Sequence, residues 1–154
     1  MVRNHFTATG VVFNDKNEIL MVNHAKLRVW LPPGGHVNEN ELPCDAVLRE
    51  IFEETGVTAR VMPNRRGVGT PRCPELTMPF TILLEDIEGD GTHNHIDMIY
   101  LCKAITGEIN PQASEVRGAG WFTFEQIIEL KTFDNVLRTM EQAAAYLKTR
   151  GNNA

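Results

Sequence analysis

A chain of 154 residues with 42% hydrophobic residues is long enough to bury a core, so disorder is excluded and one domain, residues 1–154, is predicted. The net charge of −5 argues against a non-specific binder of nucleic-acid polymers or membrane surfaces, because both functions need a basic surface. Three widely spaced cysteines, no apolar leader and no run long enough to span a membrane together predict a cytoplasmic location.

The first part of the chain predicts two antiparallel strands and a loop. Residues 6–13 alternate weakly and are rich in Thr and Val, and residues 18–23 form the predicted partner strand across a turn at 14–17. Residues 24–36 contain two prolines and two adjacent glycines. These residue types disfavour a central strand and allow a sharp turn, so we expect a loop there.

Residues 42–55 predict an amphipathic helix on which acidic side chains gather. Pro43 suits the first turn, and Gly56 follows the last turn, where positive φ is common. Three glutamates share one solvent-accessible side: Glu50, Glu53 and Glu54. Like charges at these spacings repel, and the C-terminal end of a helix dipole favours cations. A bound Mg²⁺ or Mn²⁺ explains this arrangement better than a solvated acidic face does.

The helix and the loop before it carry a longer motif. Gly35 is followed after five residues by Glu41, and after seven more by the segment REIFEETGV at residues 49–57. This pattern matches the Nudix box at every fixed position, so the chain resembles Nudix hydrolases. The resemblance implies metal-dependent hydrolysis of a nucleoside diphosphate derivative: a nucleoside triphosphate, ADP-ribose, a dinucleoside polyphosphate or a nucleotide sugar. It also implies an α/β/α sandwich with a mixed sheet between helices, which agrees with the α+β order of the predicted elements.

The same resemblance implies roles for single residues of the box. Glu50, Glu53 and Glu54 are the implied ligands of Mg²⁺ or Mn²⁺. Arg49 is the residue expected to hold a glutamate by a charged hydrogen bond, and Glu41 is a candidate outer-sphere contributor. For the general base, the order of candidates is Glu54, then Glu53, then a glutamate outside the box.

That outside glutamate is Glu115, which precedes Trp121 and Phe122 as a recurring Nudix glutamate does. In some members this residue reaches the metal, so Glu115 is a candidate both for metal binding and for catalysis. An ordinary surface position is the alternative. No regular element is assigned to residues 107–120.

After the box, strands are predicted at residues 57–62, 80–87 and 96–104, the last two joined by an Asp-Gly turn. Residues 63–79 are irregular, proline-rich and long for a loop without function. The loop contains three basic residues that are candidates for substrate phosphate binding: Arg65, Arg66 and Arg72. A solvated surface loop explains them equally well.

Histidines gather near the following turn. His93, His95 and Asp97 alternate, so their side chains share one face of a strand. The pattern fits a transition-metal site, but we favour a wall of the substrate cleft because the carboxylates already explain a metal. His95, together with His36 before the box, is therefore assigned to substrate binding, with simple solvent exposure as the alternative for each.

Two helices are predicted near the C-terminus. Thr123 and Gln126 form a capping box for a short helix at 124–130, and Asp134 caps a longer one that ends near Thr149.

The preferred interpretation is a hydrolase with a small nucleoside diphosphate derivative as substrate, and a homodimer is left open. One alternative is a non-catalytic Nudix module that senses a nucleotide or binds a partner, although the box is intact. A second alternative is a Nudix isomerase, for which the chain is short.

Overall fold

In the computed structural model, which describes residues 1–112 and 114–151, the described residues form one mixed sheet of eight strands. The main path runs β3-β2-β1-β7-β5, with β4 paired to β1, β6 to β7 and β8 to β2. The strands are β1 (Arg3–Phe13), β2 (Ile19–His24), β3 (Trp30–Leu31), β4 (Gly34–His36), β5 (Ala59–Val61), β6 (Thr81–Asp86), β7 (His93–Ala104) and β8 (Val116–Phe122). The helices are α1 (Pro43–Thr55), α2 (Phe124–Ile128) and α3 (Asp134–Gly151).

The two long strands β1 and β7 lie at the centre of this sheet. They pair in parallel over their whole common length, from Arg3 beside His93 to Phe13 beside Lys103. The predicted antiparallel pair of β1 and β2 is present but meets only at the turn, with Phe13 opposite Ile19. Strand β7 also pairs antiparallel with β5 and β6, so the mixed sheet predicted from the sequence is confirmed.

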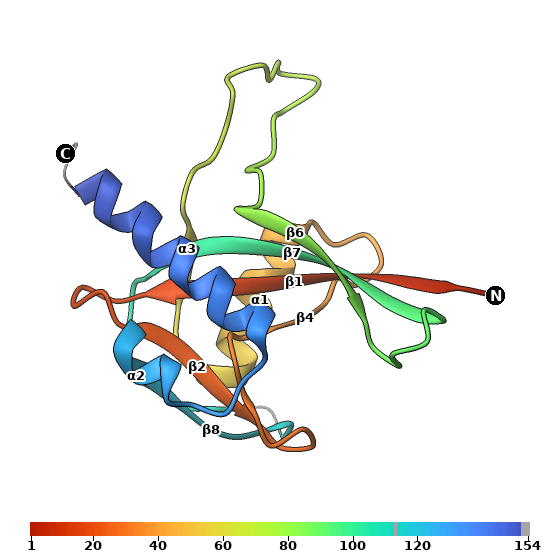
Figure 1. Cartoon of the computed structure of the whole chain (residues 1–154). Coiled ribbons are helices and arrows are strands. Elements are labelled where there is room, and N and C mark those ends of the chain that lie inside the picture. Colours follow the sequence, from red (N-terminus) through yellow and green to blue (C-terminus); the bar gives the residue numbers. More distant parts are fainter. Residues whose placement is uncertain (113, 152–154) are drawn as a thin grey trace.

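Helices cover both faces of the sheet, with α3 in front and α1 behind in Figure 1. Odd-numbered residues of β1 and β7 pack toward α2 and α3 in a core that includes Val11, Phe13, Ile99, Leu101, Ile127 and Met140. Even-numbered residues pack toward α1 in a second core that includes Ala8, Val12, Val47, Ile51, Tyr100 and Cys102. Side chains alternate along a strand, so residue parity in β1 and β7 tells which helix a side chain faces.

Helix α1 begins and ends as the sequence predicts. Leu42 is the N-cap and Pro43 opens the helix. Gly56 closes it with a φ of 74°, and its N–H donates to the Phe52 carbonyl over 2.7 Å. Phe52 of the same helix is 43% exposed, so it lies at the margin of the face that α1 packs against the sheet.

Several strands differ from the sequence-based expectation. Strand β8 lies in the segment to which no element was assigned, and it pairs antiparallel with β2, Ile19 opposite Phe122. Gly118 and Gly120 interrupt its hydrophobic alternation, which hid the strand in the sequence. Strand β4 forms within the predicted loop because Pro32 and Pro33 precede it and leave its ladder with β1 intact.

The two C-terminal helices are present, with small differences from the predicted bounds. Thr123 and Gln126 form the capping box of α2 as predicted, but α2 ends at Ile128 and not at residue 130. Asp134 lies in the first turn of α3 and not before it, and the helix continues to Gly151, two residues beyond the predicted end.

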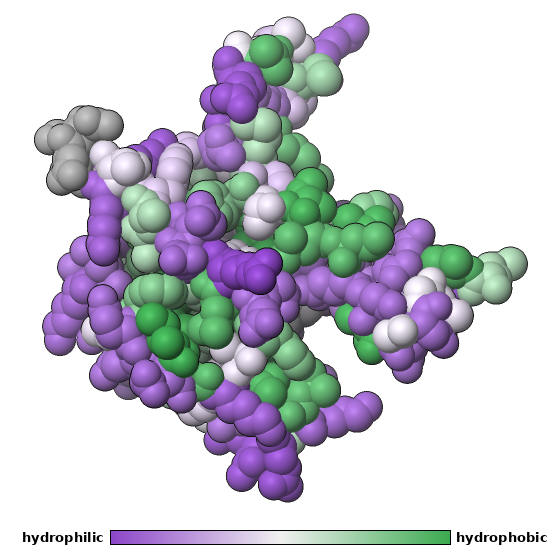
Figure 2. Space-filling model, viewed as in Figure 1, coloured by the Kyte–Doolittle hydropathy of each residue, from purple (hydrophilic) through white to green (hydrophobic). Residues whose placement is uncertain are grey.

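The surface view in Figure 2 is largely polar, with apolar side chains gathered near β6. Ile82 and Leu84 on β6 are 56% and 68% exposed. Within the described residues, no helix has both the length and the apolar character needed to cross a lipid bilayer.

Candidate active site

Arg49 on α1 holds the carboxylates of the box in place. Its Nε and Nη2 donate to the two oxygens of Glu41 over 2.8 and 3.0 Å, a fork-to-fork pair. Its Nη1 donates to Glu50 over 2.7 Å and to Glu53 over 3.2 Å. The remaining Nη2 donation reaches the carbonyl of His36 over 2.9 Å, which ties the helix to β4. These bonds raise the pKa of the guanidinium and lower the pKa of Glu41.

Glu54 lies on the inner side of this cluster and is only 8% exposed. The sequence-based expectation that the whole acidic face is solvent-accessible is therefore wrong for this residue. Burial first, and then the charge of Glu50, raise the pKa of Glu54 to about 8. A hydrogen bond from the Gly34 N–H opposes this change only in part. A carboxyl with this pKa is protonated at neutral pH unless a cation balances the surrounding charge.

Two glycines of the box fit tightly against the site. A Cβ on Gly35 would lie 2.5 Å from the Cδ of Glu50, so a larger residue would displace that carboxylate. A Cβ on Gly56 would clash with the carbonyl oxygen of Asn110. Glycine at position 35 therefore leaves room for the Glu50 carboxylate, and position 56 requires glycine both for this backbone contact and for its positive φ.

The segment after β7 is fastened to the end of α1 and leads to Glu115. The N–H of Asn110 donates to the Thr55 carbonyl over 2.7 Å, and the N–H of Gln112 donates to the Glu53 carbonyl over 3.0 Å. Glu115 itself is exposed, and its carbonyl accepts from the Ala25 N–H over 2.8 Å. Its charge also contributes to the raised pKa of Glu54, after the effects of burial and of Glu50.

The donor set consists of carboxylates, and Mg²⁺ and Mn²⁺ prefer such oxygen ligands. The charges of Glu50, Glu115 and Glu53 add to the burial of Glu54 in raising its pKa. Among the described residues, however, no three of these carboxylates have oxygens that all lie within 4.8 Å of one another, so they would have to move closer to share one ion. A cation among them would oppose the effects of burial and charge that raise the pKa of Glu54.

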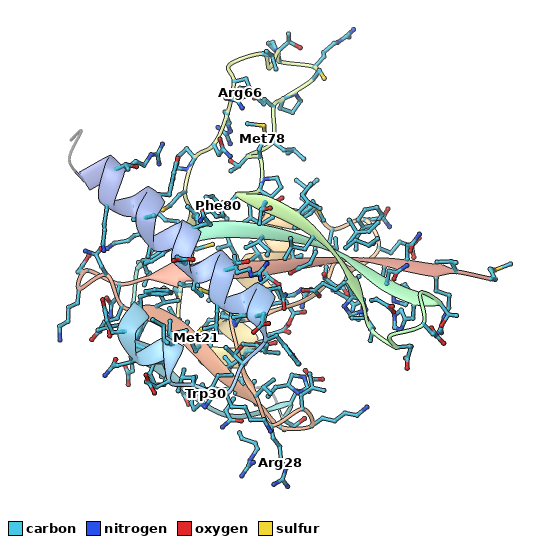
Figure 3. All side chains as sticks on the ribbon, in the orientation of Figure 1. Met21, Arg28, Trp30, Arg66, Met78 and Phe80 are labelled. Atoms are coloured by element: carbon cyan, nitrogen blue, oxygen red, sulfur yellow. The ribbon has the colours of Figure 1, made fainter. Side chains whose placement is uncertain are left out.

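The three arginines assigned to substrate binding are not brought to these carboxylates. They lie on the loop between β5 and β6, which extends from the body of the molecule in Figure 1, and Figure 3 shows Arg66 well out along it. Among the described residues, no hydrogen bond or ion pair joins Arg65, Arg66 or Arg72 to a box glutamate. The loop is instead fastened to itself, since the Glu75 carboxylate accepts from the N–H groups of residues 66–68.

The two histidines assigned to substrate binding are brought together. The ring centroids of His36 and His95 are 4.9 Å apart, and those of His93 and His95 are 5.2 Å apart. A fourth ring, His5, lies 4.8 Å from His93 and 5.4 Å from His36. Burial, together with the neighbouring imidazoles, lowers the pKa of both His5 and His95.

Sequence reasoning missed His5 and the two threonines that hold Asp97. Thr7 and Thr9 each donate from Oγ1 to Asp97 over 2.9 Å. All of these residues have odd numbers in β1 or β7, and the parallel register places His5 beside His95 and Thr7 beside Asp97. The alternation was visible in the sequence, but the pairing of two distant strands was not.

An open pocket of about 620 Å³ adjoins both the Arg49 cluster and the histidines. Its lining includes Phe6, His36, Glu41 and Met98. This volume lies in the range of small-molecule sites in proteins.

Comparison with known proteins identifies the family. A family model for the NUDIX domain matches residues 3–143. The chain is also 30% identical to Phosphatase NudJ of Escherichia coli (strain K12), a match that covers 76% of this chain and 78% of that protein. The chain therefore belongs to the Nudix family, as its box predicted.

A curated relative and a solved structure agree with this assignment. The chain is 29% identical to the probable DHNTP pyrophosphohydrolase of Lactococcus lactis subsp. cremoris (strain MG1363), over 77% of this chain and 63% of that protein. It therefore spans less than two thirds of that relative. A crystal structure of a Nudix-family hydrolase from Clostridium perfringens superposes with a TM-score of 0.80 at 27% identity, covering 95% of this chain and 99% of that one. The sandwich architecture is thus that of the family.

Proposed function

We propose that this protein, as a single domain, hydrolyses the diphosphate linkage of a nucleoside diphosphate derivative with the help of Mg²⁺ or Mn²⁺. The observation that carries the proposal is the buried carboxyl of Glu54 among the carboxylates of Glu50, Glu53 and Glu115. Such a cluster is unfavourable without a cation and suits one with oxygen ligands. Family membership and the named pyrophosphohydrolase relative support the same chemistry.

The residues that would hold the cation are Glu50, Glu54 and, from outside the box, Glu115, with Glu53 as a further ligand. A bound divalent cation would polarise a phosphoryl oxygen and neutralise charge on the leaving phosphate. Arg49 is the positioning residue in this scheme. It fixes the carboxylate of Glu50 through Nη1 and takes its own orientation from the bidentate pair with Glu41.

The attacking water needs a proton acceptor, and the candidates among the four carboxyls are Glu54, then Glu53, then Glu115. Glu54 ranks first because it is the buried carboxyl among the others, shielded from bulk solvent. Glu53 ranks next because it is half exposed and can reach a solvent molecule.

The substrate is proposed to lie along β4, with its phosphates between the carboxylates and the histidines. His36 follows Gly35 directly, and its carbonyl accepts a hydrogen bond from Arg49. His36 therefore lies between the carboxylates that Arg49 holds and the other histidines. His36 and His95 would then line the phosphate side of the cleft. Binding by Arg65, Arg66 and Arg72 would require the loop that carries them to fold back toward the body.

A substrate panel in metal tests the proposal. Nucleoside triphosphates, ADP-ribose, dinucleoside polyphosphates and nucleotide sugars are incubated with Mg²⁺ or with excess EDTA, and products are resolved by chromatography. Reaction in ¹⁸O-labelled water, followed by mass spectrometry of both products, identifies the phosphorus that is attacked. We expect metal-dependent cleavage of one class, with the label in a phosphate group.

Matched variants separate the site from the fold. Glu50→Gln removes an expected ligand, whereas Glu125→Gln changes an exposed glutamate on α2. We expect the first to lose activity and the second to keep it. Cleavage of no compound by a folded protein would favour the nucleotide-sensing module, and full activity in Glu50→Gln would contradict the proposed cation site.

A further inference from the structure

A second group of potential metal ligands lies on the face of the sheet opposite to α1. Three histidines from three strands offer nitrogen atoms that all lie within 4.8 Å of one another: His5, His36 and His95. The box glutamates come from α1, so this group is built from different elements. Arg49 separates the two groups, since it bonds the His36 carbonyl on one side and Glu50 on the other.

The strand register explains why these rings converge. His5 on β1 lies beside His95 on β7 in the parallel ladder. His36 on β4 lies opposite Thr7, one position further along the same face of β1. Three adjacent strands thus present their imidazoles to one point, and the rigid sheet keeps them there.

One nitrogen in this group has no hydrogen-bond partner among the residues that the structure describes. Nε2 of His95 is buried and makes no hydrogen bond to any described residue. A buried polar atom without a partner costs about 1–3 kcal/mol, so such an atom indicates a missing ligand or solvent molecule. Its position among two further imidazoles favours a ligand that accepts several nitrogen lone pairs.

One of these histidines also contacts groups that could orient its ring, as carboxylates and further histidines do around metal-binding histidines. The ring nitrogens His5 Nδ1 and His93 Nε2 are 3.1 Å apart, and His93 Nδ1 lies 3.6 Å from a carboxylate oxygen of Glu88. Such a carboxylate–histidine chain orients a ligand ring and fixes its tautomer, which leaves Nε2 of His5 free. On the neighbouring strand, Glu85 lies opposite His95. Burial, and then the charge of Asp97, raise the pKa of Glu85 to about 7.

We propose that His5, His36 and His95 form a binding site for a divalent transition-metal ion of the zinc class, separate from the carboxylate site. Three neutral imidazoles with a fourth position open are a known arrangement for Zn²⁺. Zn–N bonds of about 2.0–2.1 Å in tetrahedral geometry place ligand nitrogens roughly 3.4 Å apart. The three nitrogens lie within 4.8 Å of one another, so each pair must approach by at most about 1.4 Å to reach this geometry. His36 is exposed, so the open position faces solvent and the substrate side of the cleft.

Phosphate binding is the competing explanation for the cluster. The geometry points to a cation, because the three ligand nitrogens come from three strands, lie within 4.8 Å of one another and include a buried Nε2 without a hydrogen-bond partner among the described residues. An ion held there keeps an open position toward the cleft, where a phosphate oxygen of the substrate would lie.

Zinc stoichiometry tests the proposal without any assay of hydrolysis. Chelator-treated protein is loaded with Zn²⁺ in millimolar Mg²⁺, which occupies carboxylate sites, then desalted and measured by plasma mass spectrometry and calorimetry. Replacing Zn²⁺ by Co²⁺ gives a visible spectrum that reports tetrahedral nitrogen ligation. We expect one ion per chain, retained in the double variant Glu50→Gln/Glu54→Gln.

Graded variants locate the ion. His36→Gln and His95→Gln should each weaken Zn²⁺ binding by more than about 100-fold, and His93→Gln by about 10–100-fold, because His93 contacts the ligand His5 and not the ion. His24→Gln is the matched control, because His24 lies outside the cluster and contacts the Leu27 N–H instead. His36 is exposed, so its replacement leaves folding intact, which thermal melting verifies.

Three results would overturn the proposal. They are wild-type protein without bound zinc, zinc retained in both His36→Gln and His95→Gln, and zinc lost in the double glutamate variant. Stabilisation by inorganic pyrophosphate in the absence of zinc, abolished by His36→Gln, would assign the cluster to anions instead. Because the readout is bound metal, failure of this proposal is distinguishable from failure of the proposed hydrolysis.

Discussion

Replacing Glu54 by Gln should stabilise the metal-free protein while abolishing turnover. The carboxyl is buried beside like charges, which raise its pKa from 4.5 to about 8 on folding. A raised pKa means that the folded state binds the proton more tightly than the unfolded chain does. Stability from this group is therefore fully present below pH 4.5, is lost as pH rises toward 8, and changes no further above that pH.

The size of the effect follows from the two pKa values. Their difference, 8 minus 4.5, corresponds to at most about 5 kcal/mol of unfolding free energy at roughly 1.4 kcal/mol per pH unit. Local relaxation and entry of water reduce this, so we expect a gain of about 2–3 kcal/mol for Glu54→Gln at pH 9. In a domain of this size, that is a rise of roughly 4–12 °C in melting temperature.

Thermal melts in EDTA between pH 5 and 9 measure this effect, with Glu53→Gln as the matched control. Glu53 lies on the same helix, but its side chain is 49% exposed, so its replacement should change stability by less than about 0.5 kcal/mol. Saturating Mg²⁺ should then stabilise the wild type more than Glu54→Gln. If Glu54→Gln is no more stable than wild type at pH 9, or if the two proteins lose stability in parallel as pH rises, the reasoning is refuted.

Three further substitutions test the supports of the site. Arg49→Gln should lower Mg²⁺ affinity or turnover by about 10–100-fold, measured by metal titration of activity, because it releases Glu41 and Glu50 together. Gly35→Ala should weaken Mg²⁺ binding in calorimetry, since its Cβ would lie 2.5 Å from the Glu50 carboxyl carbon; unchanged affinity would contradict that close contact. Gly56→Ala should lower the free energy of unfolding in urea by about 1–3 kcal/mol, because φ at this position is 74° and the added carbon would clash with the backbone of Asn110.

The sequence predicted the parts of the fold that depend on local signals. Helix α1 opens at Pro43 and ends at Gly56, and α2 is capped by Thr123, as expected from short-range chemistry. The acidic side of α1 was also correct as a pattern. The burial of Glu54 was not predicted, because it depends on β4 and on the segment that leads to Glu115. Glycines and prolines hid β4 in the sequence, and the segment before Glu115 is distant from α1 along the chain.

The histidine cluster was also predicted only in part, because it depends on contacts between residues distant in sequence. Alternation predicted that His93, His95 and Asp97 share a face, and this is confirmed by the strand geometry. The addition of His5 depends on a parallel pairing between the first strand and a strand some ninety positions later. Hydrophobic patterns do not encode which distant strand becomes a neighbour, so this part of the site required the three-dimensional fold.

Both clusters lie where the chain departs from what stability alone would favour. A buried carboxyl among carboxylates, and a buried imidazole nitrogen without a partner, each oppose folding. Elsewhere the same strands are filled by well-packed Val, Ile and Leu side chains. Unfavourable local arrangements tend to occur at functional sites. Here the two lie on either side of β4, and Arg49 connects them through its bonds to Glu50 and to the His36 carbonyl. If the two proposed sites bind their ions, a cation would relieve the repulsion around Glu54 and a nitrogen-binding ion would pair the buried imidazole nitrogen, so each metal should raise the melting temperature.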